Sequence, residues 1–298
     1  MIAIEFPTAW QTYLAARAWY PDFPDPVTPE PVSGVLEAVE RSSAQVVLLD
    51  AYGVLHQGGP GFPWARAAFH QLRCRNLELL LLTNDASGDK QAIAERNGSR
   101  GFLVSPSEIV AGVDLLPDLL KERPLHWGVA GSWGNPFAHL MTQPTQLGES
   151  PNLWDRVEGI LLLDTDTWTA GLQRNLAQTM RVNPRPLVVC NPDVACPYEG
   201  GAVSGEPGYF LYQACPDADI TFLGKPFPGV YDRAAALFPH IPRSRFLAVG
   251  DSPHTDVLGA RAAGMKALMV QTGFTAGQDP VALFEQSGIW PDYIAPRL

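Results

Sequence analysis

The sequence predicts a two-domain α/β protein built on parallel sheets. From Gln45 onward, apolar segments of strand length alternate with segments of helical periodicity, the pattern of a parallel sheet with crossover helices. Strand candidates such as Leu77–Thr83 are apolar almost throughout, as expected where helices cover both faces of a sheet. The length of 298 residues exceeds what one core usually holds, so a second domain is expected.

Composition narrows the class of protein. Hydrophobic residues make up 46% and charged residues 17% of the chain, which indicates a folded, loop-rich globular protein. The net charge of −10, without any block of Lys or Arg, argues against a nucleic-acid partner. The start lacks the features of a secretory signal, and no stretch approaches the roughly 18 apolar residues of a membrane span. We therefore expect a cytoplasmic protein without a membrane partner, whose four cysteines are reduced thiols.

Residues 1–43 are expected to form an extension that packs on the core. Aromatic side chains are frequent near its start, and the prolines from Pro24 to Pro31 exclude a continuous helix. Ser33–Arg41 is expected to be a short helix that leads into the first strand. Contact of these aromatics with a second subunit or with a substrate is an alternative.

The remaining elements follow in three runs. In the first run the pattern predicts strands at Val46–Asp50 and Leu77–Thr83, and helices at Trp64–Arg75, Asp89–Asn97 and Ser107–Glu122. After Pro124 a second α/β unit is predicted, with strands and one helix at His126–Ala130, Glu158–Leu163, Thr169–Val182 and Pro186–Cys190. The alternation then resumes at Ile220–Leu223, Val230–Phe238, Phe246–Gly250, Thr255–Ala263 and Lys266–Gln271.

Four polar clusters each follow one of the apolar strands. They are Asp50-Ala51-Tyr52-Gly53, Thr83-Asn84-Asp85, Gly224-Lys225-Pro226 and the longer segment from Gly250-Asp251 to Thr255-Asp256. The carboxyl ends of parallel strands meet at one edge of a sheet, where open α/β sheets place their chemistry. The clusters are therefore expected to share one pocket.

These residue types suit an attack on phosphate. A carboxylate that attacks a phosphate dianion must overcome repulsion between like charges. A Lys ammonium, hydroxyl groups and a divalent cation held by carboxylates supply the compensating charge. Mg²⁺ prefers oxygen ligands, so two or three carboxylates and a backbone carbonyl suffice to hold it.

With these motifs the chain resembles the haloacid dehalogenase (HAD) superfamily, particularly its class IIA hydrolases, the p-nitrophenyl phosphatase-like branch. The resemblance covers about residues 35–275 and includes the four clusters, Asn191-Pro192-Asp193 and Tyr231. It implies a Rossmann-like parallel-sheet core with an inserted α/β cap domain. It also implies Mg²⁺-dependent hydrolysis of a small phosphorylated substrate. Caps of this branch often mediate dimers, so a homodimer is an open alternative.

The resemblance also implies a role for each site residue. Asp50 is the nucleophile that forms an aspartyl-phosphate, and Lys225 neutralises the phosphoryl group. The resemblance assigns substrate binding to Gly53, Thr83 and Asn84. The metal ligands are Asp50, the carbonyl of Tyr52 and Asp251, with Asp256 in support.

Motif spacing supports a cap inserted after the second motif. Thr83 comes 33 positions after Asp50, which is too few for a cap domain, whereas Lys225 comes 141 positions after Asn84, which suffices. The cap is therefore expected at residues 125–219, and the core at residues 44–124 and 220–298. Asn191-Pro192-Asp193 follows a cap strand. It is either a plain turn or faces the active site, where Asn191 and Asp193 would bind substrate.

Tyr52 departs from the family pattern. HAD phosphatases carry a second Asp at this place, which acts as general acid and base. General acid–base catalysis is typically worth about 10²–10⁴ in rate, and a tyrosine with a pKa of about 10 is a poor base near neutral pH. We expect a weakened activity that favours activated esters. His56 either substitutes as base or has a structural or cap-facing role.

Two other functions are alternatives. One is a non-catalytic descendant that binds a phosphorylated ligand or a partner through the same pocket. The other is a 2-haloacid dehalogenase, because Asp50-Ala51-Tyr52-Gly53 also resembles the start of those enzymes. Dehalogenases place a helical cap between the first two motifs, where this chain has no room for one.

Overall fold

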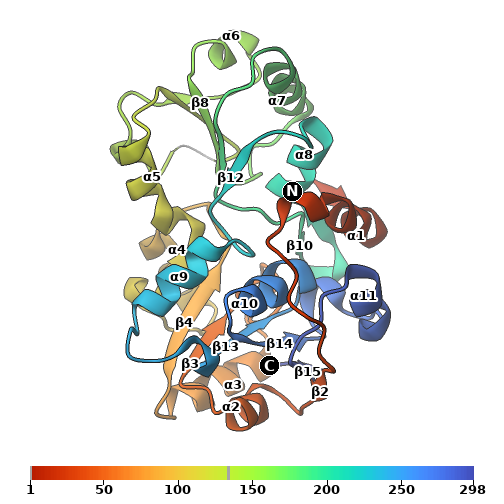
Figure 1. Ribbon diagram of the computed structural model, residues 1–298. Coiled ribbons are helices and arrows are strands. Elements are labelled where there is room, and N and C mark those ends of the chain that lie inside the picture. Colours follow the sequence, from red (N-terminus) through yellow and green to blue (C-terminus); the bar gives the residue numbers. More distant parts are fainter. Residues whose placement is uncertain (1, 133–134) are drawn as a thin grey trace.

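The computed structural model describes residues 2–132 and 135–298, which form a core unit and a cap unit (Figure 1). The core is a seven-stranded sheet with the order β2-β15-β14-β13-β3-β4-β5, and every neighbouring pair is parallel. Its strands are β2 (Glu30–Pro31), β3 (Val46–Leu49), β4 (Glu78–Thr83), β5 (Ile109–Ala111), β13 (Phe246–Gly250), β14 (Lys266–Val270) and β15 (Tyr293–Ala295). The predicted α/β class with a parallel sheet is confirmed.

Helices cover both faces of the core sheet. Successive residues of β3 point to opposite faces, so Val47 and Leu49 pack with α2 and α3, whereas Val46 and Leu48 pack with α9 and α10. Both faces are therefore apolar, which explains the unbroken hydrophobic runs of these strands. The core helices are α2 (Val35–Ser42), α3 (Pro63–Arg73), α4 (Lys90–Ser99), α9 (Pro228–Ala236), α10 (Leu258–Ala262) and α11 (Pro280–Ser287).

The cap contains a five-stranded parallel sheet with the order β12-β9-β8-β6-β7. Its strands are β6 (Trp127–Ala130), β7 (Thr145–Gln146), β8 (Gly159–Leu162), β9 (Leu187–Val189) and β12 (Ile220–Phe222). The helices of this part of the chain are α5 (Leu116–Glu122), α6 (Pro151–Trp154), α7 (Ala170–Val182) and α8 (Pro207–Ala214). Only α3 lies between β3 and β4, so that interval holds no cap.

Segments at both ends of the predicted cap contact the cap sheet. Ile220–Leu223 was expected to be a core strand, but β12 pairs with β9 in the cap sheet. Before residue 125, Leu116 and Leu120 of α5 already pack with Trp127 and Val129 of the cap. An apolar strand has the same pattern in either parallel sheet, and only its hydrogen-bonded neighbour decides which sheet it joins.

The predicted helix at Ser107–Glu122 is also wrong in its first half. Ile109–Ala111 forms β5, which pairs with β4 at the edge of the core sheet. Only Leu116–Glu122 is α-helical, and Pro117 lies in its first turn, where a proline is tolerated. The apolar residues of this segment fit helical spacing, but the open edge of β4 provides backbone partners that favour a strand.

The N-terminal segment contributes to a third sheet. β1 (Ala3–Ile4) pairs antiparallel with β11 (Val203–Gly205), which also pairs with β10 (Ala195–Pro197). Helix α1 (Phe6–Ala15) follows and lies at the boundary between cap and core (Figure 1). In the described part of the chain, no helix is both long and apolar enough to cross a bilayer.

Candidate active site

The pairing of β3 with β13 brings two acidic turns together at the carboxyl edge of the core sheet. Leu49 of β3 lies opposite Val249 of β13, and the Asp50 amide donates to the Val249 carbonyl across 3.0 Å. Asp50 and Asp251 therefore leave adjacent strands at the same level. The chain turns sharply at Gly53, where φ is +81°, a conformation that favours glycine.

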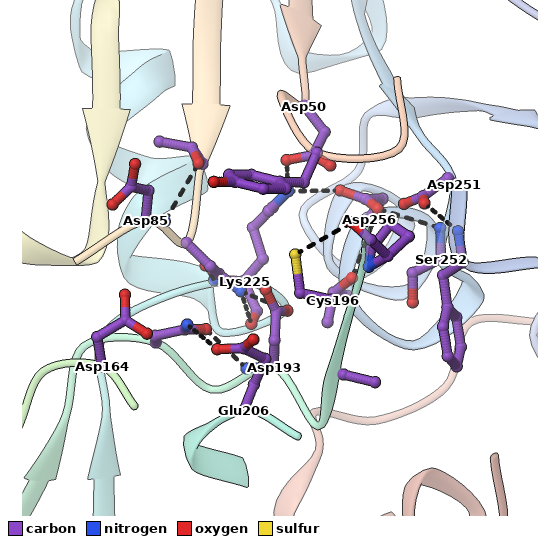
Figure 2. Close-up of a pocket in the computed structure, with 18 of the residues that line it drawn as sticks. Asp50, Asp85, Asp164, Asp193, Cys196, Glu206, Lys225, Asp251, Ser252 and Asp256 are labelled. Atoms are coloured by element: carbon purple, nitrogen blue, oxygen red, sulfur yellow. Dashed lines mark hydrogen bonds and ion pairs between the residues drawn. The ribbon is translucent and has the colours of Figure 1, made fainter. Parts of the chain in front are cut away.

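Lys225 connects the two turns through its ammonium group. Its Nζ lies 2.6 Å from Asp50 Oδ1 and 2.7 Å from Asp256 Oδ1, and the side chain is almost completely buried (Figure 2). Asn84 fixes the backbone of this lysine. The Asn84 Oδ1 accepts from the Lys225 amide at 2.7 Å, and Asn84 Nδ2 donates to the Lys225 carbonyl at 3.1 Å.

Three carboxylates gather beside this lysine. Among the described residues, Asp50, Asp251 and Asp256 each place an oxygen within 4.8 Å of the others, and all three are buried. One ammonium leaves an excess of buried negative charge. Burial raises the pKa of Asp50 and of Asp251, and the neighbouring carboxylates raise both further, although Lys225 opposes the shift.

Two glycines make room for the Asp251 carboxylate. A Cβ at Gly53 would lie 1.8 Å from Asp251 Oδ2, and a Cβ at Gly273 would lie 2.0 Å from the same oxygen. Asp251 Oδ2 also accepts from the Phe274 amide at 2.6 Å. The oxygen-only donor set, its excess charge and this close packing suit a hard divalent cation such as Mg²⁺.

Asp256 is held by a π-helical turn, Pro253–Val257. The Ser252 amide donates to Asp256 Oδ2 at 3.2 Å, and the hydroxyl of Tyr231 donates to the Thr255 carbonyl at 3.1 Å. Tyr231 lies on α9, a few residues after Lys225. The short segment from Lys225 to Tyr231 therefore supplies the ammonium group. It also supports the turn that carries Asp256, the second carboxylate in contact with that ammonium.

Tyr52 and His56 differ in their relation to the pocket. Tyr52 lines it, and burial, together with Cys196 and Asp85 nearby, raises the pKa of the phenol so that it remains protonated. His56 is fully buried and does not line the pocket, and its Nδ1 accepts from the Gly58 amide at 3.1 Å. Burial lowers the pKa of His56 to about 4. Its contacts in this structure are structural rather than catalytic.

The cap closes the pocket from the opposite side (Figure 2). Asp193 Oδ1 accepts from Asn84 Nδ2 at 2.8 Å, so this cap carboxylate contacts the core directly. Burial raises the pKa of Asp193 to about 6, although Lys225 and Asn84 oppose the shift. Asp164, Cys196 and Glu206 face the same small cavity, whose volume is about 90 Å³.

The cavity is strongly acidic. Lys225 is the single cation among the described residues that line it, whereas eight carboxylates do so. Those carboxylates are Asp50, Asp85, Asp164, Asp166, Asp193, Glu206, Asp251 and Asp256. Arg96 pairs with Asp85 at 2.8 Å from outside the lining. The cap side of the cavity is therefore unsuited to an additional anionic group on a ligand.

The structure brings together most of the residues that the sequence singles out. The cavity is lined by Asp50, Tyr52, Thr83, Asn84, Asn191, Asp193, Lys225, Asp251 and Asp256. Gly53 does not line it and instead lies against the Asp251 carboxylate. Asn84 is engaged in three hydrogen bonds with Lys225 and Asp193, so its amide connects core and cap. Asn191-Pro192-Asp193 faces the cavity rather than forming a distant turn.

Some of the residues that line the cavity were not singled out by the sequence analysis. Asp164 follows the apolar strand β8 after one more apolar residue, Leu163, much as Asp50 follows β3, so the same strand-end rule would have found it. Ser252 and Thr255 lie within a motif that was recognised for its aspartates. Tyr13 and Glu206 carry no local signal, because only tertiary packing brings α1 and the antiparallel pair β10–β11, the cap hairpin, to the pocket.

The fold and this acidic edge define a cap-bearing α/β hydrolase. The family model described as haloacid dehalogenase-like hydrolase matches residues 47–141, and the one described as HAD-hydrolase-like matches residues 222–298. The two matches lie on either side of the main part of the cap and contain Asp50, Lys225 and Asp251. The chain belongs to the haloacid dehalogenase-like hydrolases, as its motifs predict.

Curated relatives match most of the chain. It is 26% identical to a glycerol-3-phosphate phosphatase of Gallus gallus, over 85% of this chain and 89% of the relative. It is 21% identical to an acid sugar phosphatase of Staphylococcus saprophyticus, over 83% of this chain and 92% of the relative. The matches include both the core and the cap.

Solved structures share the fold. A structure from Cytophaga hutchinsonii, described as a possible sugar phosphatase of the HAD superfamily, superimposes with a TM-score of 0.78 at 19% identity. It covers 91% of this chain and 98% of its own. The 4-nitrophenylphosphatase of Thermotoga maritima gives a TM-score of 0.67 at 19% identity, with coverage of 86% and 95%.

Proposed function

We propose that this protein is a Mg²⁺-dependent hydrolase of small phosphate monoesters that acts through an aspartyl-phosphate on Asp50. The observation that carries the proposal is the buried Lys225 ammonium, 2.6 Å from Asp50 and 2.7 Å from Asp256, beside a third carboxylate, Asp251. A nucleophilic carboxylate, a fixed cation and an oxygen-rich cation site are the groups that phosphoryl transfer to an aspartate needs.

The reaction takes place in two displacements. A carboxylate oxygen of Asp50 attacks phosphorus, the bond from phosphorus to the ester oxygen breaks, and the leaving alkoxide takes up a proton. Water then attacks the same phosphorus and loses a proton to the solvent, the bond to the Asp50 oxygen breaks, and phosphate leaves with the Asp50 carboxylate restored. Lys225 offsets the charge of the phosphoryl oxygens in both steps.

The metal site is proposed from the same residues. Asp50, Asp251 and the Tyr52 carbonyl would hold Mg²⁺, with Asp256 in support. When bound, the ion supplies positive charge that neutralises phosphoryl oxygens. Asp256 also accepts from Lys225, so it aligns the ammonium as well as completing the acidic set.

Tyr52 determines which reaction step we expect to be slow and which substrates we expect to react best. Its protonated phenol can donate a hydrogen bond or a proton to the leaving oxygen, but it is a poor base for activating water. We therefore infer that breakdown of the phospho-enzyme is slow and that esters with good leaving groups react best.

The alcohol part of the substrate is proposed to be small, neutral and hydroxylated. The carboxyl groups of Asp164, Asp193 and Glu206 can form hydrogen bonds with hydroxyl groups, whereas a second phosphate or a carboxylate would find no cationic lining residue on this side of the cavity. The names of the relatives, a glycerol-3-phosphate phosphatase and an acid sugar phosphatase, support this class.

The test is turnover of p-nitrophenyl phosphate by the purified protein with Mg²⁺ and with EDTA. We expect Mg²⁺-dependent release of nitrophenol that Asp50→Asn abolishes, and beryllofluoride binding that the same variant loses. Across a panel of phosphate esters, we expect faster turnover of glycerol and sugar monophosphates than of bisphosphates. No turnover across the panel, together with tight binding of one phosphorylated ligand, would instead identify a non-catalytic binding protein.

A further inference from the structure

The N-terminal segment joins the cap to the core beside the pocket. β1 pairs with β11 of the cap hairpin, and the indole of Trp10 donates to Gln286 of α11 in the core at 2.7 Å. Trp19 donates to the Pro216 carbonyl of the cap at 2.9 Å. One continuous segment is thus attached to both units.

The apolar contacts of this segment also span the two units. Ala9, Trp10 and Tyr13 of α1 share one buried cluster with residues of the cap and of the core. The cap members are Val194, Ala195 and Val203, and the core members are Phe274 and Leu283. Because Phe274 donates its amide to Asp251, this cluster lies directly behind the acidic turn.

Tyr13 makes the most specific of these contacts. Its hydroxyl oxygen accepts from the Val194 amide of the cap at 3.2 Å. Its ring stacks on the imidazole of His254, with centroids 4.7 Å apart and an angle of 13° between the planes. The side chain is 1% exposed and reaches the cavity lining.

Both partners of Tyr13 adjoin site residues. Val194 follows Asp193, the cap carboxylate that receives the Asn84 hydrogen bond. His254 lies in the turn between Asp251 and Asp256 and is almost fully buried. Its ring also packs edge-on against the Trp10 ring, with the two ring centroids 4.9 Å apart. The Tyr13 side chain therefore contacts both the loop that carries Asp193 and the segment between Asp251 and Asp256.

We propose that Tyr13 is a positioning residue that fixes the Asp193 loop of the cap over the acidic turn of the core. The proposal rests on the hydrolase function above and adds the N-terminal segment to its specificity-determining parts. Removing the hydroxyl leaves the Val194 amide without its acceptor in a buried place, which loosens the loop. Asp193 then contacts the alcohol part of the substrate less well, in the ground state and the transition state alike.

Tyr20 provides a matched control. Its hydroxyl is also buried, but it has no hydrogen-bond partner among the described residues. Its ring lies 5.9 Å from that of His254. Tyr20→Phe therefore removes the same atom from the same segment and the same aromatic cluster, without removing a hydrogen bond to the cap.

The experiment compares Tyr13→Phe with Tyr20→Phe. For glycerol phosphate, whose hydroxyl groups can donate to the Asp193 carboxyl, we expect Tyr13→Phe in the presence of Mg²⁺ to raise KM by roughly three- to tenfold, the worth of one hydrogen bond, with kcat nearly unchanged. Tyr20→Phe should leave both constants near those of the wild type. In an Asp193→Asn background, Tyr13→Phe should add little, because the two changes act through the same loop.

Hydrogen exchange supplies a measurement that does not depend on activity. The peptide containing Val194 should lose protection in Tyr13→Phe and keep it in Tyr20→Phe. Unchanged protection and unchanged KM in Tyr13→Phe would overturn the proposal, as would equal effects of the two variants. A wild type without turnover would refute the hydrolase function instead, and the exchange result would still decide the role of Tyr13 in holding the loop.

Discussion

The Nζ of Lys225 lies 2.6 Å from Asp50 Oδ1, although 175 positions separate the two residues. The chain reaches Lys225 only after leaving the core, building the cap and returning through β12. Asn84, at the end of β4, then fixes the lysine backbone. The ion pair thus joins two segments that lie on either side of the cap in the sequence.

Replacing Lys225 should damage both stability and activity. Lys225→Met leaves Asp50 and Asp256 buried without their cation. We expect the free energy of unfolding to fall by about 3–5 kcal/mol. Urea denaturation in EDTA measures this change, and the double variant Lys225→Met/Asp50→Asn should recover part of the stability but no turnover. If the single variant were as stable as the wild type, the buried ion pair would not exist.

Introducing the missing carboxylate should speed the reaction. With Tyr52→Asp, we expect turnover of p-nitrophenyl phosphate with Mg²⁺ to rise at least about tenfold, because a carboxylate can activate water against the phospho-enzyme. Tyr52→Asn is the control of similar size that cannot transfer a proton, and it should not gain activity. Equal rates for Tyr52→Asp and the wild type would show that this position has no catalytic role.

Removing one of the clustered carboxylates should stabilise the metal-free protein. No Lys, Arg or His among the described residues forms an ion pair with Asp251. Asp251→Asn retains an oxygen to accept the Phe274 amide while relieving repulsion from Asp50 and Asp256. In EDTA near neutral pH we expect Tm to rise by about 2–6 °C. Mg²⁺ should raise the Tm of the wild type but not that of the variant. A lower Tm for the variant in EDTA would contradict the proposed excess of negative charge.

Asp193 should make stability depend on pH in an unusual direction. Its pKa is raised from 3.8 to about 6 in the folded protein, so its contribution to stability is complete below about pH 4. That contribution is lost as the pH rises through about 6. The Asp193→Asn variant has no carboxyl group to ionise at this position. In EDTA its free energy of unfolding should therefore match that of the wild type near about pH 4.

Above the pKa of Asp193 the variant should be more stable than the wild type, by about 1–3 kcal/mol. Urea denaturation of both proteins across this pH range gives the difference directly. A difference that does not change with pH would mean that Asp193 titrates at its ordinary pKa in the folded state.

The local sequence pattern was sufficient to predict the strands that position the candidate site residues. The apolar runs before Asp50 and Asp251 predicted β3 and β13, and the meeting of parallel strand ends predicted that these carboxylates share a pocket. The same reasoning applies to Asp164 after β8. Strand type and strand-end position depend on residues that are close in sequence, so they can be inferred without the tertiary structure.

What the sequence determined by itself is therefore the α/β class, the family and the core carboxylates with their lysine. Only the tertiary structure decided that β12 joins the cap sheet, that Ile109–Ala111 completes the core sheet, and that Tyr13 stands between Asp193 and His254. The physical reason is that hydrogen-bond partners and packing neighbours across a sheet or between domains are chosen by the whole fold. A segment's own pattern shows which face it buries, but not what it is buried against.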